Sequence, residues 1–494
     1  MFGIYVLGIW QNPPGYYVDE SALSYNAYLV SQTGAGEFGP KFPLFFQIYS
    51  GGFTQYSNPT QIYLLAILFK VFGPGILTAR LFAAACVFAA SCLLGFLARR
   101  ISGKILIGAL VGATALFTPW LFEVGRLVLE TFFYPMAVVL LLWSIFRVSA
   151  KDKWNYPDVG LITFSLTLLT YSYTIGRVLG PLLAGGLIIF AVNRQRIFSI
   201  LKVWALFGST LIPLIVYASR NPELTKRFYL LSYITPESTF SEIFVNFAVR
   251  FLEDVNPVTM LLTGDINTRH HIDGAFGSFY LSAFALAVTG MVIIFLRYSR
   301  SSWWWYVLYG LLASAVPGAL TVDSFHTLRM IAYPIFLLLL MVPALEWLLE
   351  DLTVGAGPSF DPRQVFTLVL LFLFVFEATY FHTTYYRRGP DRTEAFDADF
   401  KPLYESAVAR PERPIYLFDG YWGPAYMHAF WYATLEARDT GEFVHQPFRV
   451  RPPAEVLVLS SEENCSNCQL IERKGNYILY LTNPMESEAS AKAR

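Results

Sequence analysis

Tyr16-Tyr17-Val18-Asp19-Glu20-Ser21-Ala22 is the stretch around which this chain is organised. Its acidic pair, Asp19 and Glu20, opens a short amphipathic helix directly after an apolar segment and before many more. This position predicts carboxylates at a membrane surface, where they are candidates for acid–base chemistry. A competing interpretation makes Asp19 the N-cap of the helix, because Asp is among the commonest capping residues.

The composition indicates a polytopic membrane protein. Of the 494 residues, 55% are hydrophobic and only 15% are charged, whereas roughly a quarter of a soluble domain is charged. The formal net charge is zero, so no basic face is predicted and a nucleic-acid partner is excluded. The sequence contains no Walker lysine motif, H-E-x-x-H or G-x-S-x-G, which argues against an ATPase, a zinc protease and a serine hydrolase.

Apolar segments long enough to approach the thickness of a bilayer recur along the chain. Met1–Trp10 is interpreted as the outer half of a first span, which brings the total to about eleven transmembrane helices. The other predicted spans are 76–98, 105–122, 131–147, 159–176, 177–193, 199–218, 276–296, 303–320, 328–349 and 365–386.

The apolar segment Thr60–Gly73 either crosses the membrane or lies flat on it. If it lies flat, the compact basic turns between the spans all fall on the inner face, as the positive-inside rule requires. We therefore predict an interfacial helix, with the N-terminus inside and the C-terminus outside. The predicted fold is an all-α polytopic membrane domain over 1–389 with juxtamembrane amphipathic helices and outer loops at 11–75 and 219–275.

The long second loop contains an amphipathic helix suited to the headgroup layer of the membrane. Its apolar side chains recur at helical spacing, with charged and amide side chains on the opposite face. The apolar residues are Phe244, Phe247, Ala248, Phe251 and Leu252.

The tail, 390–494, is charged and proline-punctuated, and predicts a small soluble α/β domain on the outer side. Strands are predicted at 415–419, 456–460 and 477–481, with a helix at 424–437. Cys465 and Cys468 offer only two ligands for zinc, which prefers four. A local disulfide is the expected state in an exported domain.

Charged residues at the outer ends of the spans are candidates for binding an anion. The spacing predicts one shared helical face for Glu123, Arg126 and Glu130. These side chains either neutralise one another as a ladder of ion pairs, or they face a cavity in which Arg126 binds a phosphate or a substrate carboxylate. Arg177 emerges on the same outer face, either to bind or simply to snorkel.

Two polar turns are the remaining candidates for a site. In 265–271, Arg269 and His270 are suited to an anionic headgroup, and His270, His271 and Asp265 to a metal. Without a convincing third metal ligand, a divalent metal is not favoured and no cofactor is predicted. The predicted substrate cavity is lined by Tyr56, Asn58, Asp265, His326 and Arg329.

The order and sidedness of these motifs over about residues 16–350 resemble the GT-C superfamily of polyprenyl-phosphate-sugar glycosyltransferases. Within it the chain looks most like the protein O-mannosyltransferase and lipid A aminoarabinose transferase group. The motifs that carry the resemblance are the acidic pair, Leu68-Phe69-Lys70-Val71-Phe72-Gly73, Thr78-Ala79-Arg80-Leu81, Trp120 to Arg126, Tyr171 to Arg177, Gly264 to His270 and Thr321 to Arg329.

The resemblance implies a multi-pass plasma (inner) membrane enzyme with its active site on the extracytoplasmic face. It makes Asp19 the catalytic base, with Glu20 beside it, and implies that Arg126, Arg177 and Arg269 contact the phosphate of a polyprenyl-phosphate sugar donor. The acceptor is then a protein, lipid or glycan, and membrane lipids surround the spans. His270 is a further candidate for the phosphate, and an inverting single displacement is implied.

Two departures from the family pattern leave the donor sugar and acceptor open. The mannosyltransferases carry a histidine before the flat helix and the aminoarabinose enzymes a Glu-Lys pair, whereas this chain has Tyr56-Ser57-Asn58-Pro59. The trefoil domain of the mannosyltransferases is also absent.

A transporter or lipid flippase is the alternative function. Such a protein would have ionisable residues at the middle of its spans, whereas the charged residues here lie mainly at one face of the membrane. A receptor that binds a ligand through its outer domain is a third interpretation, but it does not explain why Asp19 and the arginines occur together.

Overall fold

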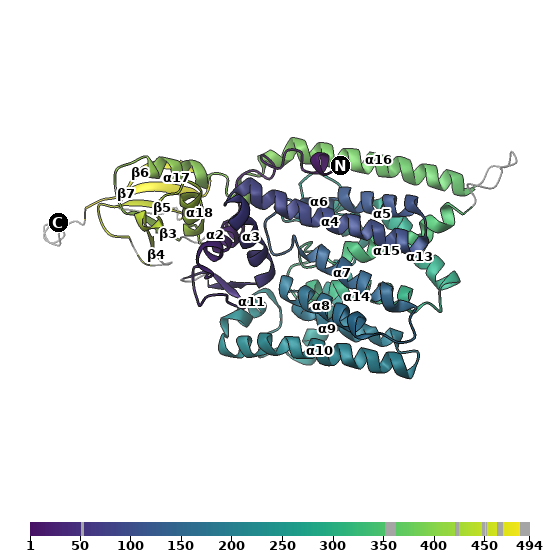
Figure 1. Cartoon of the computed structure of the whole chain (residues 1–494). Helices are drawn as coiled ribbons and strands as arrows, with labels where there is room; N and C mark the ends of the chain where they lie inside the picture. The colour runs from purple at the N-terminus through teal and green to yellow at the C-terminus, as the bar shows by residue number, and fades with distance from the viewer. Residues whose placement is uncertain are drawn as a thin grey trace. The chain divides into compact units, whose positions relative to one another are not determined.

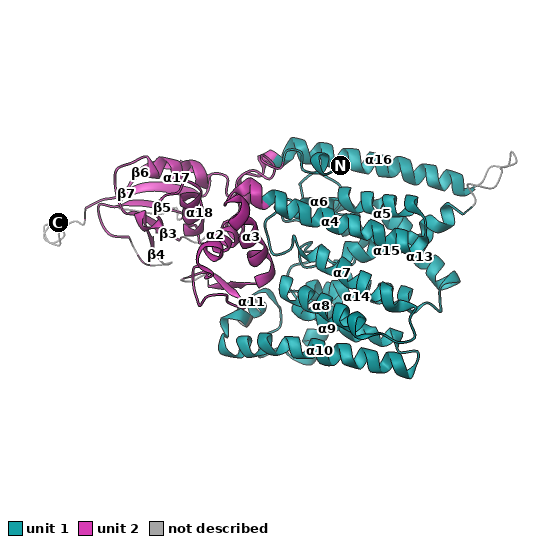
Figure 2. Ribbon diagram, in the orientation of Figure 1, with its two compact units in different colours: residues 1–8, 80–389 teal, residues 9–79, 390–494 magenta. Residues whose placement is uncertain are grey.

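The computed structural model describes residues 1–50, 54–350, 362–419, 424–446, 450, 452–461 and 468–484. The chain divides into two compact units, shown in Figure 2. Unit 1 contains residues 1–8 and 80–389, and unit 2 contains residues 9–79 and 390–494. The first loop therefore packs in one unit with the C-terminal segment, although they are far apart in the sequence.

Unit 1 is helical, and its helices lie roughly side by side (Figure 1). Each predicted spanning segment from 76 to 386 forms helix, as expected from its long apolar run. The helices are α1 Phe2–Tyr5, α4 Ile76–Ser102, α5 Ile105–Phe117, α6 Pro119–Val124, α7 Tyr134–Ser149, α8 Tyr156–Ser172, α9 Gly176–Gly186, α10 Arg194–Arg220, α11 Glu223–Leu231, α12 Phe240–Asp254, α13 Leu281–Arg297, α14 Ser302–Ala319, α15 Tyr333–Leu348 and α16 Pro362–Arg388.

The core of unit 1 centres on α15, whose side chains are almost all buried. A helix that is apolar all round is stable only inside such a core or in a membrane. By contrast, α10 and α16 expose large apolar side chains: Ile215 is 63% exposed and Phe372 is 74% exposed. Exposed apolar surface of this kind is typical of a lipid-facing helix.

Within the described ranges, three helical stretches have both the length and the apolar composition to cross a membrane: Ile76–Ser102, Arg194–Arg220 and Pro362–Asp391. The other apolar helices are shorter, so a total of about eleven spans stays a prediction. The predicted half-span at Met1–Trp10 is wrong as a continuous helix. Helix α1 is four residues long, and the chain turns at Gly8, which has a φ of 67°.

Close packing of α13 on α15 depends on Gly290. A Cβ atom at this position would lie 1.7 Å from the carbonyl oxygen of Leu340, so Gly290→Leu is expected to destabilise the protein by about 3 kcal/mol or more. The matched control is Gly208→Leu in α10, where the added Cβ meets nothing within 4 Å. Thermal unfolding in detergent should show a much lower unfolding temperature for Gly290→Leu than for Gly208→Leu. Equal unfolding temperatures for the two variants would contradict this packing.

The N-terminal part of unit 2 is built from two helices and a hairpin. Helix α2 is Val18–Thr33, and α3 is Pro59–Phe72, which packs on α2. Between them, β1 (Phe46–Tyr49) pairs antiparallel with β2 (Gln55–Ser57). The segment predicted to lie flat, Thr60–Gly73, therefore forms a helix of about the expected extent, and its interfacial placement stays a prediction.

The C-terminal part of unit 2 is the predicted small α/β fold, with a five-stranded sheet in the order β4-β3-β5-β7-β6. Strand β3 runs parallel to β4 and β5, whereas β7 is antiparallel to β5 and β6. The elements are α17 Phe400–Val408, β3 Ile415–Phe418, α18 Tyr426–Leu435, β4 Phe443–Gln446, β5 Leu457–Ser460, β6 Cys468–Lys474 and β7 Tyr477–Thr482.

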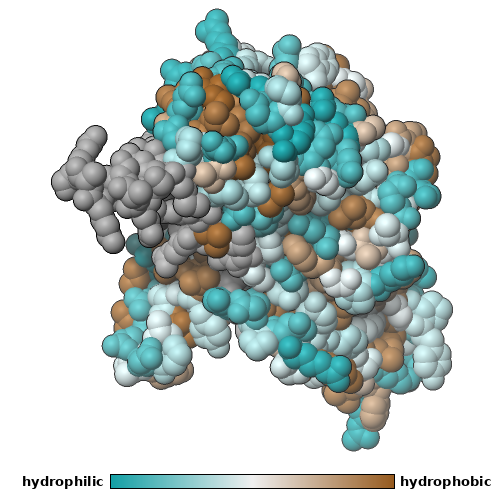
Figure 3. All heavy atoms as spheres, turned by 90° about the vertical axis from the view of Figure 1, so that its left-hand side faces the viewer, coloured by the Kyte–Doolittle hydropathy of each residue, from teal (hydrophilic) through white to brown (hydrophobic). Residues whose placement is uncertain are grey.

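The three predicted strands and the predicted helix are confirmed as β3, β5, β7 and α18. The molecular face in Figure 3 is mostly hydrophilic, with separate hydrophobic patches.

Cys468 is disulfide-bonded, whereas Cys86 and Cys92 are free. The predicted partner, Cys465, lies outside the described residues.

Candidate active site

Asp19 lies in the first turn of α2, not at its cap. The helix begins at Val18 and its N-cap is Tyr17, so the interpretation of Asp19 as the N-cap is wrong. The Asp19 side chain is half-buried, and its Oδ1 accepts a hydrogen bond from the Tyr49 hydroxyl in β1. A carboxylate in this turn is stabilised by the N-terminal end of the helix dipole.

Glu20 has a structural partner within the same turn. Its side chain is buried, and Oε2 accepts a hydrogen bond from the Tyr17 backbone N–H at 3.0 Å. This is the reciprocal bond of a capping box, which satisfies a backbone donor at the start of the helix. Of the predicted acidic pair, Asp19 is therefore the more accessible carboxylate.

The start of α2 is held by side chains from the C-terminal segment, which we call the Asp397 network. The Val18 backbone N–H donates to Asp397 Oδ2 at 3.0 Å, and the Tyr477 hydroxyl donates to Asp397 Oδ1 at 2.8 Å. His428 lies between Ser21 and Asp397, with its Nδ1 2.9 Å from Ser21 Oγ and its Nε2 3.3 Å from Asp397 Oδ2. Asp397 thus acts as a cap for α2 supplied from a distant part of the chain.

The Asp397 network is a structural element rather than a hydrolase triad. Ser21 and His428 have no exposed surface, so a substrate has no access to the serine. Nothing in the sequence distinguished Asp397 or His428, because the contact with Val18 joins residues 379 positions apart.

Tyr56 and Asn58 lie beside the hairpin that carries Tyr49. Tyr56, in β2, pairs with Gln47 of β1 and is half-buried. Asn58 is the N-cap residue of α3 and is fully buried. The structure therefore places both residues in the same unit as Asp19, and their role in a substrate cavity stays a prediction.

A second polar cluster of unit 2 was not predicted from the sequence. Asp419 directly follows β3, and its Oδ2 lies 2.5 Å from Nε2 of His445 in β4. Burial raises the pKa of Asp419, against the lowering effect of the hydrogen bond from His445. Glu37 accepts a hydrogen bond from the Tyr426 hydroxyl at 3.4 Å. Burial, and to a smaller extent the charge of Asp419, raise the pKa of Glu37 to about 8.

The raised pKa of Glu37 predicts that unit 2 loses stability as the pH rises. The folded state binds the proton more tightly than the unfolded state, so stability falls between about pH 4.5 and pH 8 and stays low above that range. Glu37→Gln should match the wild type near pH 5 and exceed its unfolding free energy by on the order of 3 kcal/mol near pH 9. Denaturation at both pH values tests this, with exposed Glu405→Gln as the control. A constant difference between Glu37→Gln and the wild type would contradict it.

Arg126 lies deep inside unit 1. Its Nη2 donates to the carbonyl oxygens of Tyr5 at 2.7 Å and Leu7 at 3.1 Å. The guanidinium carbon lies 4.3 Å from the centre of the Phe122 ring, close enough for a cation–π interaction. Arg126 therefore ties the first residues of the chain to the end of α6, and contact with a donor phosphate stays a prediction.

The predicted helical face shared by Glu123, Arg126 and Glu130 is wrong. Helix α6 ends at Val124, and the next residues form turns up to α7. Glu123 instead lies opposite His271, whose Nδ1 is 2.9 Å from its Oε2. Both side chains are buried, so this pair joins α6 to the long loop.

Arg177 and Arg269 are the less buried of the predicted phosphate-binding arginines. Arg177 is the second residue of α9 and is half-buried. Arg269 is also half-buried, and its backbone N–H donates to Asn267 Oδ1 at 3.1 Å.

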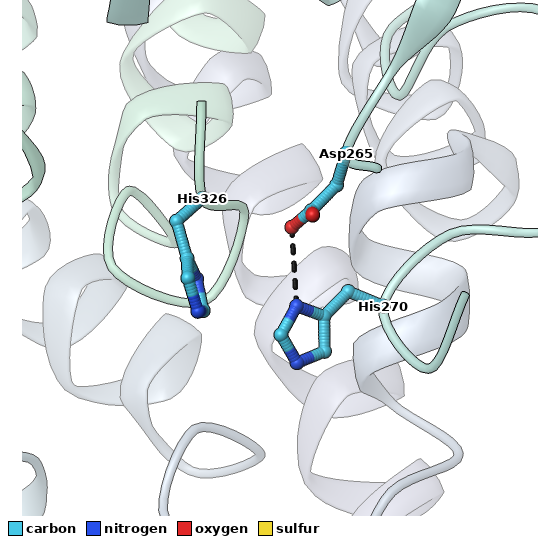
Figure 4. A group of neighbouring side chains, drawn as sticks. All are labelled: Asp265, His270 and His326. Atoms are coloured by element: carbon cyan, nitrogen blue, oxygen red, sulfur yellow. Dashed lines mark hydrogen bonds and ion pairs between the residues drawn. The ribbon is translucent and has the colours of Figure 1, made fainter. Parts of the chain in front are cut away.

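Asp265, His270 and His326 form one cluster, shown in Figure 4. Asp265 Oδ2 lies 3.1 Å from His270 Nδ1 and accepts hydrogen bonds from the Thr327 N–H at 2.8 Å and hydroxyl at 2.7 Å. Although burial raises the pKa of Asp265, the hydrogen bond and charge of His270 hold it below its usual range. Burial, and then the charges of His270 and Arg329, lower the pKa of His326 to about 3.

Arg329 is held at the edge of this cluster. Its Nη1 donates to Thr321 Oγ1 at 2.6 Å, and its Nη2 lies 2.7 Å from Asp323 Oδ2. The structure thus brings together Asp265, His270, His326 and Arg329 in unit 1, and their role in substrate binding stays a prediction. Asp19, Glu20, Tyr56 and Asn58 belong to unit 2.

The fold matches solved structures, although no protein-family model and no curated protein matches the sequence. ArnT from Cupriavidus metallidurans bound to undecaprenyl phosphate aligns with a TM-score of 0.59 and 12% identity over 97% of both chains. Its apo structure gives 0.57 and 13% identity over 97% of this chain and 96% of ArnT. The Archaeoglobus fulgidus oligosaccharyltransferase AglB, in complex with an inhibitory peptide and a dolichol-phosphate, gives 0.50 and 11% identity over 88% of this chain and 63% of AglB. These matches confirm the fold expected from the resemblance, because this chain shares its fold with ArnT and, over most of its length, with AglB.

Proposed function

We propose that this chain is an integral-membrane glycosyltransferase that uses a polyprenyl-phosphate-linked sugar donor at the extracytoplasmic face of the plasma membrane. The observation that carries this proposal is the match of nearly the whole chain to ArnT with undecaprenyl phosphate bound. The match to AglB with a dolichol-phosphate adds a second fold relative that holds a lipid phosphate. The apolar helices of unit 1 provide a suitable environment for the lipid tail.

In the proposed mechanism Asp19 is the general base. It takes the proton of the acceptor hydroxyl, whose oxygen attacks the anomeric carbon of the donor sugar. The bond from that carbon to the phosphate oxygen breaks, and the polyprenyl phosphate leaves, with inversion at the anomeric carbon. The Tyr49 hydroxyl donates a hydrogen bond to Asp19 Oδ1. This bond orients the carboxylate, which matters because a general base must be correctly positioned to act.

The cations of unit 1 are proposed to stabilise the leaving phosphate. Arg177 and Arg269 are assigned this role as positive groups and His270 as a hydrogen-bond donor, because fixed donors and cations stabilise negative charge that develops in the transition state. Arg126 is assigned to the same phosphate through its charge, since its Nη2 already donates to two carbonyl oxygens.

Lipid binding tests the donor class directly. At about 100 times its dissociation constant, undecaprenyl phosphate should increase the unfolding free energy of the purified protein by about 2.7 kcal/mol. Undecaprenol, which has the same tail without the phosphate, is the control and should have a much smaller effect. Equal stabilisation by both lipids, or by neither, would contradict a phosphate-recognising site.

Arg177→Gln tests the phosphate contact. The variant is expected to lower kcat/KM for the lipid-linked donor by about 10²–10³, as for loss of one transition-state donor. The control is Arg438→Gln, in unit 2, which removes an arginine that forms ion pairs with Glu436 and Glu442. Transfer assays with one donor preparation compare the two variants. An unchanged kcat/KM for Arg177→Gln would remove this residue from the phosphate site.

A further inference from the structure

We infer that Asp265, His270 and His326 form a binding site for a divalent transition metal, with Zn²⁺ the best-suited ion. One ligand atom from each side chain lies within 4.8 Å of the others. Figure 4 shows the carboxylate of Asp265 facing the His270 ring, with the His326 ring to one side of them. Two imidazole nitrogens and one carboxylate oxygen are a common ligand set for Zn²⁺.

The third ligand comes from a turn that the sequence does not place near the other two. His271, adjacent to His270, is excluded because its Nδ1 faces Glu123 and its Nε2 lies 2.7 Å from the Phe276 carbonyl oxygen. His326 instead reaches the cluster from the turn between α14 and α15. The His270 and His326 rings lie 4.7 Å apart, centre to centre.

His326 also provides an independent sign of a missing partner. Its Nδ1 is buried and makes no hydrogen bond within the described part of the chain. A buried nitrogen without a partner costs about 1–3 kcal/mol. A metal ion bound at this nitrogen would supply the missing partner and offset that cost.

The surroundings hold the Asp265 carboxylate in place for a ligand role. Thr327 donates two hydrogen bonds to Oδ2, and the Asn267 N–H donates to Oδ1 at 2.9 Å. Outer hydrogen bonds of this kind orient ligands in known metal sites. Small side-chain rotations would bring the ligand atoms to the distance of about 3.4 Å that tetrahedral Zn²⁺ requires.

The local charge permits a cation. The positive charge of Arg329 acts on His326, but Asp323 pairs with Arg329 at 2.7 Å and neutralises it. Asp265 supplies the negative charge of the site itself. Three protein ligands leave a coordination position open, as in catalytic zinc sites, and a phosphate oxygen is a suitable fourth ligand. The ion would link the loop 264–271 to the turn 321–329.

Metal binding by the purified full-length chain tests this inference without any activity assay. After dialysis against a chelator, calorimetric titration should show one Zn²⁺ per chain, and Co²⁺ should produce the visible absorption of a tetrahedral site. His270→Gln and His326→Gln should each weaken binding by about 10–100-fold or more. His445→Gln, a histidine of unit 2, is the control and should bind as the wild type does.

The following results would overturn the inference. Wild-type protein that binds no Zn²⁺, or both cluster variants binding as tightly as the wild type, would contradict the site. The same holds if the chelated protein binds inorganic phosphate through His270 and His326 but no metal. Because a variant that misfolds would also lose binding, each variant is checked by gel filtration and thermal unfolding. Asp265→Asn, which keeps the shape and one oxygen ligand, should weaken binding in a folded protein.

Discussion

Asp19→Asn is expected to lower the rate of sugar transfer by a factor of about 10²–10⁴. Asparagine keeps the shape of the side chain and an oxygen that can accept the Tyr49 hydrogen bond, but it cannot take the proton of the acceptor. The loss should therefore appear in kcat, while donor binding and the unfolding temperature change little. Single-turnover transfer with a lipid-linked donor measures the effect.

Two variants separate a loss of the base from a loss of charge or structure. Glu405→Gln removes an exposed carboxylate of unit 2 that pairs with Lys401 at 3.6 Å, and should transfer sugar at the wild-type rate. Glu20→Gln removes the buried partner of the Tyr17 N–H and should lower stability by about 1 kcal/mol, with a smaller effect on transfer than Asp19→Asn. If Asp19→Asn retained full activity, the aspartate would not be the base.

Asp397→Asn is expected to destabilise unit 2 by about 3 kcal/mol, because this half-buried acceptor serves the Val18 N–H, the Tyr477 hydroxyl and His428. Hydrogen bonds to a charged acceptor contribute about 1.5–3 kcal/mol each, and an amide replaces them only in part. Since the start of α2 loses its cap, activity should fall together with protection of the helix from hydrogen exchange.

The exposed Asp391→Asn is the matched control for Asp397→Asn, since it changes the same functional group a few residues away. It should leave both stability and exchange in α2 unchanged. Equal exchange rates for residues 18–24 in the wild type and in Asp397→Asn would contradict the role of this network. A drop in global stability with normal exchange at α2 would assign Asp397 to the sheet alone.

The helices could be predicted from the sequence because their signal is local. A long apolar run needs no information from the rest of the chain, and the segment that became α15 is apolar on every side. Strands β3, β5 and β7 were found for the same reason, as short apolar runs. Strand β6 was missed because it carries Glu472, Arg473 and Lys474 on an exposed edge.

The partners of the site residues could not be predicted, because they depend on packing between distant segments. His326 joins Asp265 across 61 positions, and Tyr49 joins Asp19 across 30. The spacing of Glu123 and Arg126 gave a wrong helical face, since α6 ends at Val124. Gly125 allows this end to approach Tyr5, whose hydroxyl would lie 2.6 Å from an added Cβ.

Mass spectrometry of the lipid that remains with the purified protein tests the central claim most directly. Wild-type protein is expected to carry a polyprenyl phosphate sugar that loses its sugar when acceptor is added, whereas Asp19→Asn should carry the same lipid and keep the sugar. The account would be contradicted if no polyprenyl phosphate were present, or if both proteins released the sugar at the same rate.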